Sequence, residues 1–147
     1  MASEKNVEFL LKAHQKIIKD YPRIKLLIIG DGPDKEKYEK LVENLNIENN
    51  VIFNGKAAWE EIPYYYHCSD IFATASRSET QGLTVIEAMA SEKTPLCIND
   101  ESFLGTITNE LNGLIFETEE EYITHVITLY KNDNLLKYYN KQARIQA

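Results

Sequence analysis

Cysteine is scarce in this sequence, long apolar runs are lacking, and basic residues are outnumbered by acidic ones; each of these features excludes a class of protein. The two cysteines, Cys68 and Cys97, stand in no metal-binding or redox spacing, so we expect reduced thiols in a reducing compartment. No apolar run approaches the roughly 20 residues that span a bilayer. No apolar region of the signal-peptide type follows residues 1–5. The sequence therefore predicts a cytoplasmic protein.

The charge balance argues against a polyanionic partner. The 147 residues include 23 acidic and 16 basic side chains, for a net charge of −7. Nucleic acids bind basic surfaces, so we expect no nucleic-acid partner, and the chain alone is poorly suited to an anionic membrane. Apolar residues make up 44% of the chain and charged residues 27%, which are ordinary globular values. A chain of this length corresponds to one domain with a sizeable core.

Short apolar segments alternate with amphipathic ones along the whole chain. The predicted strands are 25–29, 51–53, 71–73, 96–98 and 114–116, and the predicted helices are 5–20, 35–45, 60–67, 83–91, 119–130 and 135–147. Alternation of this kind predicts an α/β fold with a doubly wound parallel sheet. In such a sheet ligands bind outside the carboxyl ends of the strands. No strand precedes the first helix, so we expect the domain to be incomplete at its N-terminal edge.

Glycines gather at the edge of the predicted sheet where a ligand would lie. We place all six in loops, and four of them, Gly30, Gly32, Gly55 and Gly82, lie in connections that lead from a strand toward a helix. Glycine lets a ligand approach the backbone closely, although any one of these residues taken alone is better explained as an ordinary turn glycine. Their shared position favours a binding role.

Two glutamates flank a predicted helix start in residues 76–90. A polar loop with a glycine leads into the helix, whose first amides form an anion site. Glu79 precedes the turn and Glu87 lies about one turn inside the helix, so both carboxylates can reach a ligand over the helix start. Carboxylates accept hydrogen bonds from vicinal hydroxyls, and the combination describes a nucleotide sugar. The alternative is a capping Glu79 and a solvated Glu87, and spacing alone leaves both open.

A family resemblance decides between these interpretations. The donor-site motif of the retaining glycosyltransferases of family 4, which have the two-domain GT-B fold, resembles residues 78–90, Ser-Glu-Thr-Gln-Gly-Leu-Thr-Val-Ile-Glu-Ala-Met-Ala. Further similar segments, in family order, are 3–6, 27–33, 51–55, 68–72 and 112–116. The resemblance covers most of the chain. It implies the Rossmann-like C-terminal half of a GT-B fold, which binds the sugar donor.

The resemblance also implies roles for individual residues. Lys5 would contact the donor pyrophosphate and Glu79 the hydroxyls of the transferred sugar, so these are the predicted catalytic residues. Glu87 would bind the ribose and Ala57 the base, through backbone atoms. The remaining donor-binding positions are Gly30, at the ligand-facing edge, and the turn formed by Thr80, Gln81, Gly82 and Leu83. By spacing alone, Lys5 would be a solvated lysine.

The implied reaction is transfer of a hexose, with glucose expected, from a nucleoside-diphosphate sugar to an acceptor, with retention of the anomeric configuration. UDP-glucose is the expected donor, and the resemblance implies no cofactor and no metal. Residues 78–84 and the Tyr-rich segment 62–66 are most similar to bacterial diacylglycerol glucosyltransferases of membrane glycolipid synthesis. That similarity implies a lipid acceptor at the inner face of the membrane. The alternatives are a capsule or cell-wall polysaccharide enzyme of the same fold and a non-catalytic nucleotide-binding regulatory domain.

The sequence departs from the family pattern in several places. The arginine upstream of Lys5, the first strand of the domain and the N-terminal acceptor domain are all absent, so we expect the isolated chain to transfer nothing. Any acceptor or peripheral membrane contact would belong to the full-length protein. The late loop 100–105 lacks the usual Gly-Gly-x-x-Glu pattern.

Other candidate side chains have simpler explanations. We expect the three histidines to be packed or solvated, Tyr64–Tyr66 to pack at the core and its rim, and Trp59 to be a packed surface aromatic. The acidic run 119–121 suits a helix start.

Overall fold

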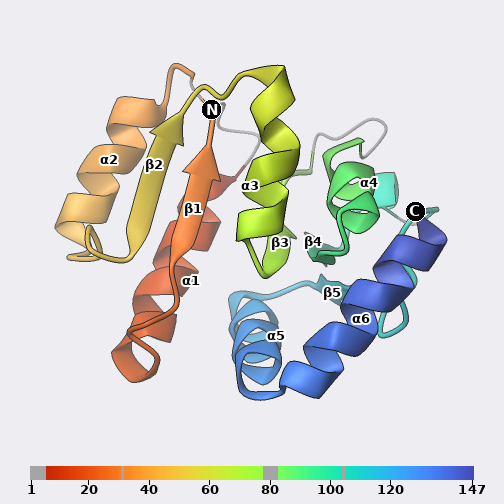
Figure 1. Cartoon of the computed structure of the whole chain (residues 1–147). Helices are drawn as coiled ribbons and strands as arrows, with labels where there is room; N and C mark the ends of the chain where they lie inside the picture. The colour runs from red at the N-terminus through yellow and green to blue at the C-terminus, as the bar shows by residue number, and fades with distance from the viewer. Residues whose placement is uncertain (1–5, 31, 78–82, 104) are drawn as a thin grey trace.

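The computed structural model describes residues 6–30, 32–77, 83–103 and 105–147 (Figure 1). The strands are β1 (Leu26–Ile29), β2 (Val51–Gly55), β3 (Ile71–Thr74), β4 (Thr94–Ile98) and β5 (Leu114–Phe116). The helices are α1 (Val7–Asp20), α2 (Lys35–Asn44), α3 (Ile62–Cys68), α4 (Leu83–Ala90), α5 (Glu119–Lys131) and α6 (Asp133–Gln146), with short 3₁₀ turns η2 (Trp59–Glu61) and η3 (Glu101–Phe103). Every predicted strand and helix is present, so the alternation of the sequence is confirmed.

Strands β2 and β4 are each two residues longer than predicted. Strand β4 begins at Thr94 rather than after Pro95, because Pro95 is already in register with Phe72 of β3. Pairing of β4 with β5 starts only at Leu96, so the proline precedes the part of β4 that has a neighbour on both sides. Gly55 is the last residue of β2 and not a loop residue.

The strands form two parallel sheets rather than the single sheet that we predicted. One sheet has the order β1-β2 and the other β3-β4-β5, and every neighbouring pair is parallel. Among the described residues, no strand pairs with β1 on the side away from β2, or with β3 on the side away from β4. The parallel α/β fold class is confirmed, but hydrogen bonding across the sheet is interrupted between β1 and β3.

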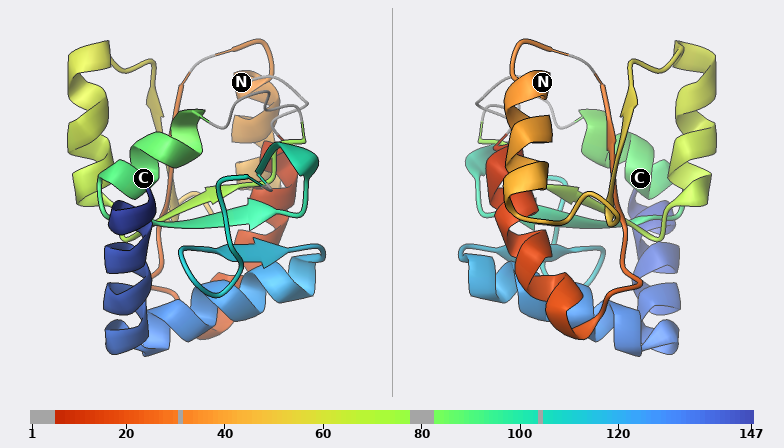
Figure 2. Two further views of the ribbon diagram at one scale, coloured as in Figure 1. Left: turned by 90° about the vertical axis from the view of Figure 1, so that its right-hand side faces the viewer. Right: turned by 90° about the vertical axis from the view of Figure 1, so that its left-hand side faces the viewer.

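Two clusters of buried side chains lie on either side of this interruption. The larger cluster surrounds β4 and β5 and includes side chains of α4, α5 and α6, whereas the smaller one joins α2 to β2. Helix α1 contributes to both: Leu10 and Ile17 belong to the larger cluster, and Val7 and Leu11 to the smaller. The apolar stripe of α1 therefore holds the two halves together, and Figure 2 shows this helix alongside α5.

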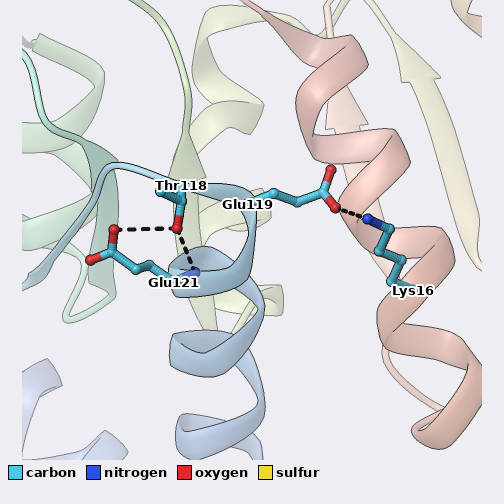
Figure 3. A network of polar contacts seen from close by, with 4 residues as sticks. All are labelled: Lys16, Thr118, Glu119 and Glu121. Atoms are coloured by element: carbon cyan, nitrogen blue, oxygen red, sulfur yellow. Dashed lines mark hydrogen bonds and ion pairs between the residues drawn. The ribbon is translucent and has the colours of Figure 1, made fainter.

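The start of α5 is fixed by a hydrogen-bonded cap and an ion pair (Figure 3). The Thr118 hydroxyl accepts a hydrogen bond from the Glu121 amide at 3.1 Å and lies 3.3 Å from the Glu121 carboxylate. The Thr118 hydroxyl thereby satisfies one of the free amides at the helix start, and the Glu121 carboxylate also accepts from the Glu117 amide at 3.3 Å. Lys16 of α1 forms an ion pair with Glu119. The acidic run lies in the first turn of α5, as predicted.

The Asn-Gly segment before β5 has a structural role. Asn112 is buried; its side-chain oxygen accepts a hydrogen bond from the Thr108 amide at 2.8 Å, and its side-chain nitrogen donates to the Thr106 carbonyl at 3.1 Å. A Cβ on Gly113 would come within 2.9 Å of the Pro95 carbonyl oxygen. This part of the family motif therefore shapes the turn into β5.

Candidate functional site

Backbone contacts join the carboxyl ends of β1 and β2. The Gly30 amide donates to the Gly55 carbonyl at 2.8 Å, and both glycines have positive φ, 129° and 77°. Such angles are costly for residues with a Cβ, so glycine is required here for the backbone to leave the strands. In Figure 1 the arrowheads of β1 and β2 point the same way, which brings Gly30 and the segment that contains Ala57 to one edge.

Lysine 35 adds a positive charge to this edge. It is the first residue of α2, and its ammonium nitrogen lies 3.7 Å from the position that a Cβ on Gly55 would occupy. A cation at a helix N-terminus opposes the helix dipole, so its place here has no benefit for the helix itself. No local pattern in the sequence indicates this role for Lys35, because only the folded chain brings it beside the end of β2.

The carboxyl ends of the second sheet are joined by side chains. Asn99, directly after β4, donates from its side-chain nitrogen to the Glu117 carboxylate at 2.6 Å. The Asn99 carbonyl accepts from the Arg77 guanidinium at 3.4 Å. The ends of β3, β4 and β5 are thereby held together.

The late loop begins with a side-chain turn at residues 100–102. The Asp100 carboxylate accepts hydrogen bonds from the Ser102 amide at 3.1 Å and the Ser102 hydroxyl at 2.7 Å, and these bonds lower the pKa of Asp100. This short turn lies at the start of the loop, where η3 begins.

Helix α4 presents Glu87 on its outer face. Leu83 is the first residue of this helix, and the helix is anchored by buried Val85, Ala88 and Met89. Glu87 lies one turn inside the helix, as predicted, and its side chain is exposed. Its carboxylate lies 3.3 Å from the Tyr66 hydroxyl of α3, which also donates to the Thr84 carbonyl at 3.1 Å.

The other predicted site residues cannot be placed. Lys5, Glu79, Thr80, Gln81 and Gly82 lie outside the described residues. The structure therefore positions Gly30, Ala57 and Glu87, together with the backbone of Leu83, and their roles remain predictions.

The aromatic and histidine predictions have mixed outcomes. Trp59 is 84% exposed, so the prediction of a packed aromatic was wrong; η2 carries the indole away from the core. Tyr64 is also exposed, and its ring meets that of Tyr65 edge to face. His14 is buried against the Ile24 carbonyl, and His125 lies within 3.1 Å of the Ile115 carbonyl. His67 is exposed, so the histidines are packed or solvated as expected.

The part of the chain that the structure describes has neither a metal-binding cluster nor a membrane-spanning helix. These residues contain no group of three or more histidine, cysteine, aspartate or glutamate side chains that could hold a metal ion. Their helices are too short or too polar to cross a membrane. An open hollow of about 560 Å³ lies between α1 and α2, lined in part by Glu8, Lys37 and Lys40, and it does not include Glu87.

Comparison with known proteins identifies the class. Residues 1–146 match the family described as glycosyl transferases group 1, and the chain belongs to that family. It is 34% identical over its whole length to the alpha-monoglucosyldiacylglycerol synthase of Acholeplasma laidlawii, and 36% identical over 119 residues to that of Streptococcus pneumoniae strain R6. The matches cover 100% and 80% of this chain, but only 37% and 27% of those two proteins.

Solved protein structures share the fold of this chain. The crystal structure of Anabaena HepE in complex with UDP-glucose superposes with a TM-score of 0.89 at 20% identity, over 99% of this chain and 41% of HepE. At this identity the likeness concerns the fold alone. It confirms the Rossmann-like GT-B architecture that the family resemblance implied.

Proposed function

We propose that the chain is the donor-binding part of a glucosyltransferase that uses UDP-glucose and retains the anomeric configuration. The observation that carries this proposal is the position of Glu87. It is an exposed carboxylate one turn inside the helix that follows β3, at the carboxyl side of the sheet where nucleotides bind in doubly wound folds. The names of the two synthases and of the UDP-glucose complex support the choice of donor.

Each site residue has a separate task in this proposal. Glu87 accepts hydrogen bonds from the ribose hydroxyls, and Glu79 holds hydroxyls of the transferred glucose. The backbone at Gly30 and Ala57 approaches the base. The positive φ and open surroundings of Gly30 support such an approach.

Charge stabilisation would supply most of the catalysis. As the bond to glucose breaks, negative charge develops on the departing diphosphate. Lys5 and the amides of residues 80–83 would stabilise that charge, because helix-start amides and cations act most strongly where charge develops. No protein nucleophile, cofactor or metal ion is part of this scheme.

Completion of the fold by further residues is part of the proposal. We infer that an additional strand lies between β1 and β3 and that a separate domain supplies the acceptor site. The interruption between the two sheets and the partial burial of both facing strands support the strand. The 147 residues alone would bind nucleotide weakly and transfer nothing.

Diacylglycerol is the proposed acceptor, and the names of the two synthases described above support it. The lipid would bind through the acceptor domain of the intact protein at the inner face of the membrane. Transfer of labelled glucose to diacylglycerol by the intact protein, with soluble saccharides as competitors, tests this acceptor. Transfer to a saccharide alone would support the polysaccharide enzyme instead.

Calorimetry of UDP binding to the intact protein tests the donor site. We expect Glu87→Ala to weaken UDP binding about tenfold or more, since hydrogen bonds to a charged group contribute roughly 1.5–3 kcal/mol. Glu43→Ala is the matched control, because Glu43 is also an exposed helix glutamate but lies in the last turn of α2. Equal affinity of the Glu87 variant and the wild type would remove Glu87 from the site. Failure of the wild type to bind any nucleoside diphosphate would favour a different class of function.

A further inference from the structure

Tyr66 connects two elements that follow strands of different sheets. It lies on α3, which follows β2, and its hydroxyl reaches the first turns of α4, which follows β3. The partners, Thr84 and Glu87, are 18 and 21 positions away in sequence. This contact therefore crosses the interruption between the two sheets, beside the proposed ribose-binding carboxylate.

Packing against a neighbouring aromatic ring holds the Tyr66 phenol in place. Tyr66 is only partly exposed, and its ring packs against Phe72 of β3 with a centroid distance of 5.9 Å. Burial and the neighbouring Glu87 carboxylate raise the pKa of Tyr66 well above its usual range, so the hydroxyl keeps its proton at physiological pH. A protonated phenol donates one hydrogen, which it shares between the Thr84 carbonyl and Glu87.

Glu87 has a single anchor in the part of the chain that the structure describes. Tyr66 is the hydrogen-bond donor that contacts its side chain there, through Oε2. A carboxylate has about four acceptor positions, so one bond from Tyr66 leaves most of them for a ligand. A glutamate side chain loses considerable rotamer freedom when it is ordered, and ordering it before the ligand arrives removes that cost from binding.

We propose that Tyr66 is a positioning residue that holds the Glu87 carboxylate ready for the ribose hydroxyls of the donor nucleotide. The proposal rests on the proposed function, because it gives Glu87 a ribose to bind. Tyr66 itself contacts no part of the nucleotide in this scheme. Its hydroxyl acts through the orientation of Glu87, and the effect is confined to ligands that carry ribose hydroxyls.

The test measures binding of UDP and of 2′,3′-dideoxy-UDP to the intact protein by calorimetry. Tyr66→Phe keeps the ring on Phe72 and removes only the hydroxyl. We expect this variant to weaken UDP binding about three- to tenfold and to leave dideoxy-UDP binding unchanged, since one hydrogen bond is affected. Tyr65→Phe is the matched control. The Tyr65 hydroxyl, one residue away, contacts Asn54 and Glu61 rather than α4, so both affinities should stay at the wild-type value.

The possible outcomes separate the two proposals. An equal loss for UDP and dideoxy-UDP would mean that Tyr66 only fastens α3 to α4, and this would overturn the positioning role while leaving the donor site intact. Unchanged UDP affinity in Tyr66→Phe would overturn it as well. If the wild type bound UDP and dideoxy-UDP equally, Glu87 would have no ribose partner. That result would contradict the proposed ribose-binding role of Glu87, on which the role of Tyr66 depends. Thermal unfolding of both variants confirms that each is folded.

Discussion

In β4 all five residues are buried, whereas each residue of β1 and of β3 is only partly buried. The difference follows from their neighbours. β4 has a hydrogen-bonded strand on both sides, whereas β1 and β3 each have one on a single side within the described residues. Short strands that are apolar throughout are typical of positions inside a parallel sheet. β1 therefore has the composition of an interior strand and the surroundings of an edge strand, which supports the additional strand proposed between the two sheets.

The largest expected contrast between the two sheets is in the free energy of unfolding. Leu96 of β4 is fully buried and Leu27 of β1 partly exposed. We expect Leu96→Ala to cost about 3–4 kcal/mol, because it leaves a cavity in the core. Leu27→Ala should cost about 1 kcal/mol, since less apolar surface is lost from the interior. Urea unfolding of the 147-residue chain measures both values.

The same two variants, Leu27→Ala and Leu96→Ala, can also be compared by their free energies of unfolding in the intact protein. An additional strand beside β1 would bury Leu27 further, so the cost of Leu27→Ala should rise toward that of Leu96→Ala. Equal costs in the 147-residue chain itself would contradict the difference between the sheets.

A smaller loss is expected where β4 and β5 meet. A Cβ on Gly113 would lie 2.8 Å from the Pro95 ring and 2.9 Å from its carbonyl oxygen, whereas a Cβ on Gly105 would meet nothing within 4 Å. Overpacking of this kind costs about 1–3 kcal/mol. We expect Gly113→Ala to lower the thermal midpoint clearly and Gly105→Ala to leave it nearly unchanged. Equal thermal midpoints for the Gly113→Ala and Gly105→Ala variants would show that the β3-β4-β5 sheet accommodates an added methyl group at Gly113.

The smallest effect concerns pH and the link between α1 and the first sheet. Burial lowers the pKa of His14 below its ordinary value of 6.5, and the Ile24 carbonyl ahead of β1 lies 3.1 Å from its ring. The unfolded chain then binds the proton more readily, so the stabilisation is complete above pH 6.5 and is lost as the pH falls through the lower, folded-state pKa. We expect His14→Gln to reduce the loss of stability between pH 7.5 and 5.5. His67→Gln, at an exposed position, should keep the wild-type dependence.

Much of the fold could be predicted from the sequence because its signals are local. The apolar runs and the helical stripes specify strands and helices within a few residues, as at β5 and α4. The division into two sheets could not be predicted, since it depends on which strands lie beside β1 and β3. Pro95 also misled the prediction of β4, because a proline is excluded only where its missing amide would be needed for pairing.

The candidate site was predictable only in part. The position of Glu87 one turn inside α4 follows from helix periodicity and a local motif. The contacts of Tyr66 and Lys35 depend on elements that are far apart in the sequence, so no local residue spacing predicts them. The exposure of Trp59 was missed for the same reason, since it depends on how η2 leaves the surface.

The ion pair between α1 and α5 also has a consequence for synthesis. Lys16 and Glu119 are 103 positions apart, so at roughly 5–20 residues per second α1 leaves the ribosome about 5–20 seconds before its partner is made. Helix α2 and the first sheet emerge in the meantime and can cover Val7 and Leu11. Leu10 and Ile17 of α1 belong to the larger cluster, whose buried members outside α1 lie between Ala75 and Ala143, so their side of α1 is completed only as the rest of the chain is made.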